Sequence, residues 1–185
     1  MGRPLGDLPA VEVENGAGAA DLAAALHDLG YRSAAVLGGP EGHRTGEARR
    51  AGFADRFAAL GGSVTTETCA FTRDGGYEAM AAVLDRDERP RVVFAANDVM
   101  AVGAMAAARD AGVEVPGDIA VAGFDDIVTL RDVTPSLTTV RLPLVEIGQA
   151  ATRLALAEED TSGDTETHFR GEVVVRDSTP PLHEA

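Results

Sequence analysis

Four short apolar segments recur along the chain at an interval that fits one kind of fold. They begin at Ser33, Val64, Arg91 and Ile119, roughly 27–31 residues apart, which is the length of a strand, a crossover helix and two loops. Most are continuous apolar runs, a pattern typical of parallel strands that are covered on both faces. The spacing therefore predicts an α/β fold with a doubly wound parallel sheet.

The segments between these strands have helical periodicity. We expect a short strand at 11–14, a helix at 17–29, strands at 33–37 and 64–71, a helix at 45–60, a helix containing 77–84, strands at 91–96 and 119–123, and a helix at 98–111. The rhythm changes after Phe124. A loop at 125–135 leads to a strand at 137–140, a helix opened by Pro143, a polar linker at 161–167 and a final strand at 172–176.

Composition excludes several classes of function. The 185 residues carry a formal charge of -14, which argues against binding to a nucleic-acid phosphate backbone. All 16 basic residues are arginine, so a P-loop lysine and a Schiff-base lysine are excluded. A single cysteine, Cys69, excludes an intrachain disulfide and a cysteine-rich zinc site. No apolar run reaches the roughly 18 residues of a membrane helix and the start lacks a signal peptide, so we expect a cytoplasmic protein without membrane contact.

Ligands of an open parallel sheet bind beyond the carboxyl ends of its strands. The residues that follow the predicted strands are polar or small: 38–40, 71–74, 97–98 and 125–126, with Arg49 and Arg50 near the same edge. Asn97 or Asp98 could instead cap the helix that follows, and 125–126 could be a turn. By themselves these residues indicate a pocket for a small polar molecule.

Nothing in the sequence completes a catalytic, metal or cofactor site. Asp98, Asp125 and Asp126 could do acid–base work, but no nucleophile or partner base accompanies them. The four histidines share no metal-ligand spacing, and Gly38-Gly39-Pro40 is not a dinucleotide fingerprint. We therefore expect no catalytic residue, no metal and no cofactor. An enzyme that acts on a sugar or nucleotide through these aspartates is an alternative to test.

The helix expected at 98–111 is apolar nearly all round. One stripe contains Met100 and Ala104, and another contains Val102 and Met105. Such a helix is buried on more than one side. One side would face the sheet and the other a neighbouring subunit, unless the helix is simply enclosed within one chain.

Five motifs, in order, resemble the LacI/GalR family of bacterial transcription regulators. They are Arg49-Arg-Ala-Gly-Phe53, residues 94–104 (FAANDVMAVGA), residues 112–126 (GVEVPGDIAVAGFDD), residues 135–140 (PSLTTV) and residues 175–180 (VRDSTP). The resemblance implies a type I periplasmic-binding-protein-like domain with two α/β subdomains joined by three crossovers. It further implies a small-molecule effector, a sugar or nucleobase-like compound, in the cleft and a homodimer formed through the helices at 76–85 and 98–111.

The resemblance also implies roles for individual residues. Arg49 would hydrogen-bond hydroxyls or a carboxylate, Phe71 would stack on the ligand, and Asn97 and Asp125 would bind its polar edge. Asp98 would cap its helix. Leu142 and Leu144 lie where some relatives place polar or aromatic contacts, so ligand specificity does not carry over.

The family pattern divides the chain into parts. Residues 1–16 resemble a remnant of the N-terminal subdomain and first crossover, 17–136 the C-terminal effector-binding subdomain, 137–170 a crossover plus an N-terminal-subdomain helix, and 171–185 the return strand and tail. The family's helix-turn-helix head has no counterpart in this sequence, so we expect DNA contact only through a head that this chain does not contain. We also expect the helix stripe of Leu144, Ile147 and Leu154 to be exposed or repacked in the isolated chain.

Two readings of the function follow. We prefer the effector-sensing and dimerisation part of a LacI-type regulator, non-enzymatic and sugar-binding; the alternative is a sugar-binding protein of a transport system, which shares the fold.

Overall fold

The computed structural model describes residues 10–156 and 166–182. Its strands are β1 (Ala10–Val13), β2 (Ser33–Leu37), β3 (Ser63–Glu67), β4 (Val92–Ala95), β5 (Ala120–Ala122), β6 (Thr139–Arg141), β7 (Glu166–Phe169) and β8 (Glu172–Val174). Its helices are α1 (Asn15–Asp28), α2 (Arg44–Ala59), α3 (Arg73–Leu84), α4 (Asp98–Asp110), α5 (Leu144–Leu156) and a short 3-10 helix, η2 (Val128–Asp132). The alternation of strands and helices that the sequence predicts is present.

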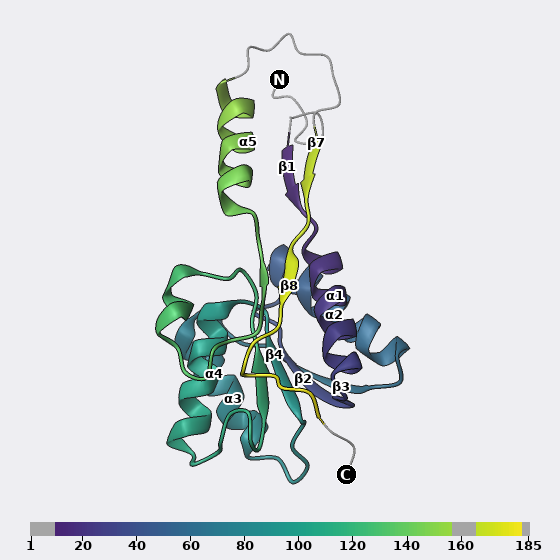
Figure 1. Ribbon diagram of the computed structural model, residues 1–185, viewed down its shortest axis with the longest axis vertical. Helices are drawn as coiled ribbons and strands as arrows, with labels where there is room; N and C mark the ends of the chain where they lie inside the picture. Colours follow the sequence, from purple (N-terminus) through teal and green to yellow (C-terminus); the bar gives the residue numbers. More distant parts are fainter. Residues whose placement is uncertain (1–9, 157–165, 183–185) are drawn as a thin grey trace.

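A four-stranded parallel sheet in the order β3-β2-β4-β5 forms the centre of the larger body (Figure 1). Helices α1 and α2 cover one face, and α3 and α4 cover the other. Successive residues of β2 pack into opposite cores: Val36 contacts the core under α1 and α2, and Leu37 contacts the core under α3 and α4. The doubly wound parallel sheet is confirmed, and its two apolar faces explain the continuous apolar runs.

Strand β3 is shorter than the sequence predicts. We expected a strand at 64–71, but β3 ends at Glu67. It is the outer strand of the sheet, its side chains are exposed or half-buried, and its pairing with β2 ends where β2 ends, at Leu37. The chain after Glu67 is therefore free to leave the sheet and bring Phe71 to its carboxyl edge.

Glycines allow the helices of each layer to touch. A Cβ atom on Gly103 of α4 would lie 1.9 Å from the carbonyl oxygen of Arg73, and one on Gly76 of α3 would lie 2.2 Å from that of Met100. A Cβ on Gly52 of α2 would lie 2.2 Å from the carbonyl oxygen of Gly16 in α1. Real Cβ contacts are never so short, so each helix pair packs backbone against backbone.

Helix α4 is buried on several sides, as predicted, and much of this burial occurs within the chain. Met100 and Ala104 face the sheet and α3 and are fully buried. On the other stripe Val99 is 42% exposed, Val102 is half-buried, and Met105 lines an open cavity. Enclosure within one chain thus accounts for part of the pattern and leaves Val99 exposed and Val102 half-buried on the second stripe.

A narrower part stands above the main body (Figure 1). It contains α5 and the parallel pair β1–β7, and it joins the body through the start of α1 and through the antiparallel pair β6–β8. The linker predicted at 161–167 is wrong at its end, because Glu166 and Thr167 belong to β7. The division into subdomain parts remains a prediction.

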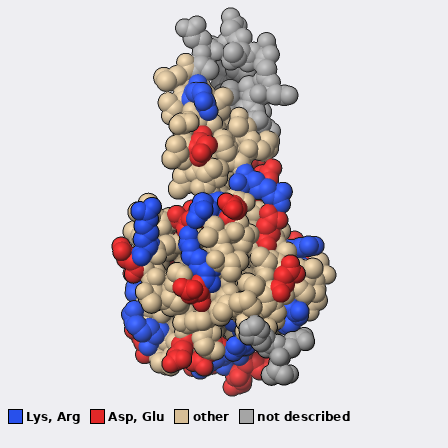
Figure 2. Space-filling model, viewed as in Figure 1, with Lys and Arg blue, Asp and Glu red and all other residues tan. Residues whose placement is uncertain are grey.

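The surface over α5 is largely uncharged (Figure 2). Leu144 is 53% exposed, as expected, whereas Ile147 and Leu154 are half-buried.

Of the helices in the described ranges, none combines the length and hydropathy that a membrane span requires.

Candidate functional site

Asn97, and not Asp98, caps helix α4. The Asn97 side-chain oxygen Oδ1 accepts a hydrogen bond of 2.7 Å from the backbone N–H of Met100, the geometry of an N-cap. The expectation that Asp98 would be the cap is therefore wrong. Capping uses only the oxygen of the amide; the Asn97 Nδ2 group has no acceptor in the part of the chain that the structure describes.

Arg49 on helix α2 is a buried charged side chain at this edge of the sheet. It is 4% exposed, and three of its N–H groups are used within the protein. Nε donates to Asn15 Oδ1 at 2.7 Å, one terminal nitrogen donates to the Ala96 carbonyl at 2.8 Å, and the other donates to Asp125 Oδ1 at 2.8 Å. Its Cζ atom lies 3.8 Å from the centre of the Phe124 ring, a cation–π contact.

Asp125 completes a cluster with Arg49 and Asn97. Its side chain is 25% exposed, and only Oδ1 is used by Arg49. Its backbone has φ 112°, which lies in the region that non-glycine residues rarely adopt, and its N–H donates to the carbonyl of Val140 at 2.9 Å. The strand-end argument that predicted a shared edge for these residues is thus correct in its geometry.

Burial shifts the pKa values of Arg49 and Asp125 toward their neutral forms, and the pairing offsets this only in part. Desolvation lowers the pKa of Arg49, while the carboxylate of Asp125 raises it. Desolvation raises the pKa of Asp125, while the charge and hydrogen bond of Arg49 lower it. An arginine stays protonated at any physiological pH, and its charge and hydrogen bond favour the ionised form of Asp125.

Phe71 lies on a different side of the cluster. Its ring packs against His43, with centroids 4.4 Å apart, and against Gly39, where a Cβ atom would lie 2.7 Å from the Phe71 ring. His43 is the N-cap of α2, accepting at Nδ1 from the Gly46 N–H at 3.1 Å. Within the described residues, Phe71 makes no polar or ring contact with Arg49, Asn97 or Asp125; its neighbours are His43 and the glycines at positions 39 and 46.

The two aspartates beside this cluster have structural partners of their own. Asp98 is fully buried; its carboxylate accepts from Thr139 Oγ1 at 2.7 Å and from the Ile127 N–H at 2.9 Å. Burial raises the pKa of Asp98 to about 7. Asp126 accepts from Arg141 and from Arg176, each at 2.7 Å. Burial alone would raise the Asp126 pKa, but the hydrogen bonds of Arg176 and Arg141 outweigh it and lower that pKa.

Sequence reasoning missed His43, Asn15 and Phe124 as parts of the site. Phe124 directly precedes Asp125 at the end of a predicted strand, so the strand-end rule could have included it. Asn15 is 34 residues from Arg49 and carries no motif, so no local signal points to it. In the described ranges, no group of three or more His, Cys, Asp or Glu side chains is arranged to hold a metal ion.

Comparison with known proteins gives a consistent result. A family model described as a periplasmic binding protein-like domain matches residues 23–179. The HTH-type transcriptional repressor PurR of Proteus mirabilis is 37% identical over 134 residues, which cover 71% of this chain and 39% of that protein. The HTH-type transcriptional repressor CytR of Escherichia coli is 32% identical over 181 residues, 95% of this chain and 53% of that protein.

The fold comparison agrees with the sequence comparison. A LacI family transcriptional regulator from Enterococcus faecium, crystallised with bound ribose, has a TM-score of 0.85 at 28% identity, covering 94% of this chain and 66% of that one. The chain spans about half or less of the length of the curated relatives named above. From the family match and these relatives, the chain belongs to the periplasmic binding protein-like family, as an effector-binding domain of the LacI-regulator type.

Proposed function

We propose that this chain is the effector-sensing part of a bacterial LacI-type transcription regulator and that its effector is a small, uncharged, hydroxylated molecule such as a sugar. Arg49, Asn97 and Asp125 bind the hydroxyl groups, and Phe71 stacks on the flat or apolar face of the ligand. A nucleobase-like compound is the second candidate, because it offers a planar face to Phe71.

The observation that carries this proposal is the set of polar groups that the cluster leaves unused. Asn97 keeps its Nδ2 donor, Asp125 keeps Oδ2 as an acceptor, and Arg49 keeps two of its five N–H groups. A hydroxyl group both donates and accepts, so vicinal hydroxyls match a site that offers donors and an acceptor side by side.

The charge balance of the cluster favours an uncharged ligand. The Arg49 guanidinium is already paired with the Asp125 carboxylate at 2.8 Å, and the chain as a whole carries a formal charge of -14. An anionic ligand would approach Asp125 as well as Arg49 and would lose part of its attraction to the arginine. The ribose in the Enterococcus faecium regulator is an uncharged polyol of the proposed kind.

Ligand-induced stabilisation tests the proposal directly. D-ribose, lactose and adenine are added to the chain, and the thermal midpoint is measured; a ligand at about 100 times its Kd adds roughly 2.7 kcal/mol. Asp125→Ala abolishes this stabilisation, whereas Asp132→Ala, at an exposed aspartate outside the cluster, retains it. Equal stabilisation of the chain and of the Asp125 variant would contradict the assignment.

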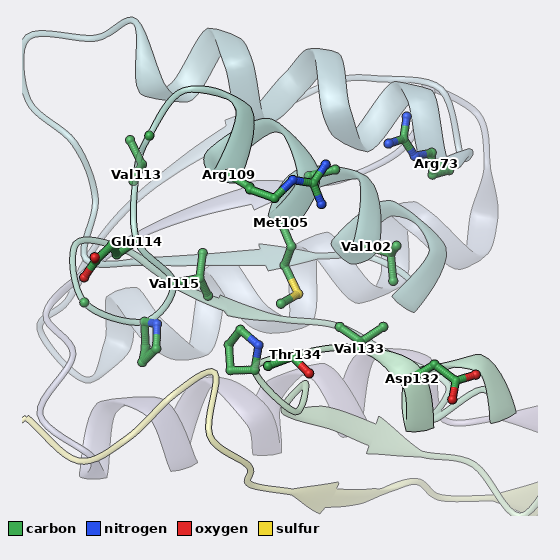
Figure 3. A pocket seen from close by; sticks show the side chains of 15 residues that line it. Arg73, Val102, Met105, Arg109, Val113, Glu114, Val115, Asp132, Val133 and Thr134 are labelled. Atoms are coloured by element: carbon green, nitrogen blue, oxygen red, sulfur yellow. The ribbon is translucent and has the colours of Figure 1, made fainter.

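We further propose that the chain dimerises through α3 and the side of α4 that carries Val99, Val102 and Met105. An open cavity of about 1030 Å³ lies between α4 and the loops at 112–117 and 132–135, and Met105 points into it between Val115 and Val133 (Figure 3). Arg109 lies on the helical side of this cavity, and Asp132 lies on the opposite side. A two-fold contact needs a self-complementary patch, and a hollow lined by apolar side chains together with charged side chains of both signs offers one.

The oligomeric state tests this second proposal. In sedimentation experiments, we expect twice the 19.1 kDa mass of the chain. Val99→Glu on α4 should yield monomers, while Val175→Glu should remain dimeric; the two valines are 42% and 47% exposed, so they are a matched pair. A monomeric parent chain, or a dimer indifferent to Val99→Glu, would count against this interface.

Regulation of DNA binding is the proposed role of the whole protein in the cytoplasm. Effector binding changes DNA affinity only if the effector binds two conformations unequally. A transport role predicts the same ligand binding but no shift of a DNA duplex by a form of the protein that carries a helix-turn-helix head. An enzymatic role predicts turnover of a sugar that is lost in Asp125→Asn.

A further inference from the structure

The turn that carries Asp125 is held in an unusual backbone conformation. Asp125 and Asp126 have φ 112° and 54°, and they are the non-glycine residues with positive φ in the described ranges. Two such residues in succession cost free energy and persist only where the surroundings hold them. The turn follows β5 at the carboxyl edge of the sheet, next to the proposed effector site.

Asp126 ties this turn to two arginines, Arg141 and Arg176, that take no part in the cluster of Arg49, Asn97 and Asp125. Its Oδ2 accepts from Arg141 Nε and its Oδ1 accepts from an Arg176 terminal nitrogen, each at 2.7 Å. The Asp126 side chain is only 12% exposed, and Arg176 also donates to the carbonyl of Leu137 at 2.7 Å. The carboxylate therefore has one positively charged partner on each oxygen.

The two arginines belong to the two strands that join the main body to the narrower part. Arg141 is the last residue of β6, directly before the connection to α5, and Arg176 follows β8, which continues from β7. Strands β6 and β8 pair with each other, with Val140 beside Val173. Asp125 is bonded to β6, because its N–H donates to the Val140 carbonyl.

Asp125 and Asp126 are consecutive residues of one turn, so a shift of the backbone at Asp126 also moves Asp125. We propose that Asp126, held by Arg141 and Arg176, is a positioning residue that sets the Asp125 carboxylate against Arg49 and couples effector occupancy to strands β6 and β8. The inference rests on the proposed effector site at Asp125. By reciprocity, a change at the β6–β8 side alters the effector site, and occupancy of that site alters β6–β8.

The test uses the chain without any effector, so it is independent of the identity of the ligand. Asp126→Asn keeps the size of the side chain and tolerates a φ near 54°. Its amide oxygen can accept from only one of the two arginines, because the amide nitrogen is a donor, and the negative charge is lost. The measured quantity is the hydrogen-exchange rate of two groups, the Nε–H of Arg49 and the backbone N–H of Asp125, both observed by 15N NMR. If the Asp126 clamp positions Asp125, hydrogen exchange of both groups accelerates at least tenfold, while the amides of β2 and β4 are unchanged.

Two further variants keep the test decisive. Arg141→Gln is at a half-exposed side chain, so it should fold even if Asp126→Asn does not, and we expect the same acceleration at Arg49 with smaller amplitude. Asp132→Asn, at an exposed aspartate of η2, is the control and leaves both signals unchanged.

The reverse direction completes the test of coupling. Asp125→Asn should accelerate amide exchange at Val140 and Arg141 in β6, although neither residue is changed. Unaltered Arg49 and Asp125 signals in folded Asp126→Asn and Arg141→Gln would overturn the positioning role. Acceleration spread evenly over the whole domain would overturn it as well, because that result is general destabilisation. Failure to find any effector would refute the proposed function and leave these measurements intact.

Discussion

Replacement of Arg49 by methionine tests how far the cluster of Arg49, Asn97 and Asp125 stabilises the folded chain. Methionine keeps an unbranched side chain of similar length but removes the charge and all N–H groups. In Arg49→Met, the Ala96 carbonyl, Asn15 Oδ1 and Asp125 Oδ1 all lose their donor. Breaking a buried ion pair costs about 3–5 kcal/mol, because one charge is left buried without a partner.

The structure allows this figure to be refined. The Asp125 side chain is 25% exposed, so water can solvate part of the carboxylate that Arg49 leaves behind. We therefore expect a loss of about 3 kcal/mol in the free energy of unfolding, equivalent to roughly 6–12 °C in Tm for a domain of this size. Arg49→Lys should lose part of this amount, because an ammonium group lacks the planar fork that reaches three acceptors.

Urea unfolding at pH 7, followed by circular dichroism, measures these changes as midpoint shifts at constant slope. Arg50→Met is the matched control: Arg50 is the next residue on α2, is half-buried, and its side chain makes no hydrogen bond within the described residues, so its replacement should cost less than about 1 kcal/mol. In an Asp125→Asn background, Arg49→Met should cost less by about 1–2 kcal/mol, since no carboxylate is left unpaired. Equal effects for Arg49→Met and Arg50→Met, or additive effects with Asp125→Asn, would refute the role of the ion pair.

Two further predictions concern stability. Gly103→Ala should destabilise the chain by about 1–3 kcal/mol despite the better helix propensity of alanine, because the new Cβ meets the backbone of α3. Gly148→Ala on α5 should instead stabilise the chain by up to about 1 kcal/mol, because no atom lies within 4 Å of its new Cβ. Thermal unfolding of both variants measures the two changes. Asp98 has a folded-state pKa of about 7 and an unfolded-state pKa of about 3.9, so the folded state binds this proton more tightly. The free energy of unfolding should therefore fall as the pH rises from 4 to 7, and Asp98 alone contributes as much as about 4 kcal/mol to this fall. Asp98→Asn can still pair with Ile127 and Thr139 and should remove that pH dependence; an unchanged pH profile in the variant would show that Asp98 is not its source.

The central sheet was predictable because its signal is local. Continuous apolar runs such as Ala34–Leu37, spaced by one helix each, are required when both faces of a parallel strand are covered. Strand β7 carried no such signal. Its sequence is polar, and it pairs with β1, more than 150 residues earlier in the chain, so its pattern alone resembles a linker.

The candidate site was predictable in location but not in detail. The strand-end rule placed Asn97 and Asp125 at one edge, which the structure bears out in position. Asn and Asp cap helices about equally well, so the sequence could not decide between Asn97 and Asp98. The decision depends on Thr139 and Ile127, which occupy the Asp98 carboxylate from parts of the chain 41 and 29 residues away.

The binding role of Asp125 and Asn97 is the central claim, and one NMR titration tests it most directly. D-ribose, lactose and adenine are titrated separately into 15N-labelled chain while the Asn97 side-chain amide and the Arg49 Nε–H signals are followed. The account predicts saturable shifts of both signals with at least one hydroxylated ligand, and no shift of either in Asp125→Ala. Saturable binding that leaves the Asn97 and Arg49 signals unmoved, or that survives unchanged in Asp125→Ala, would contradict it.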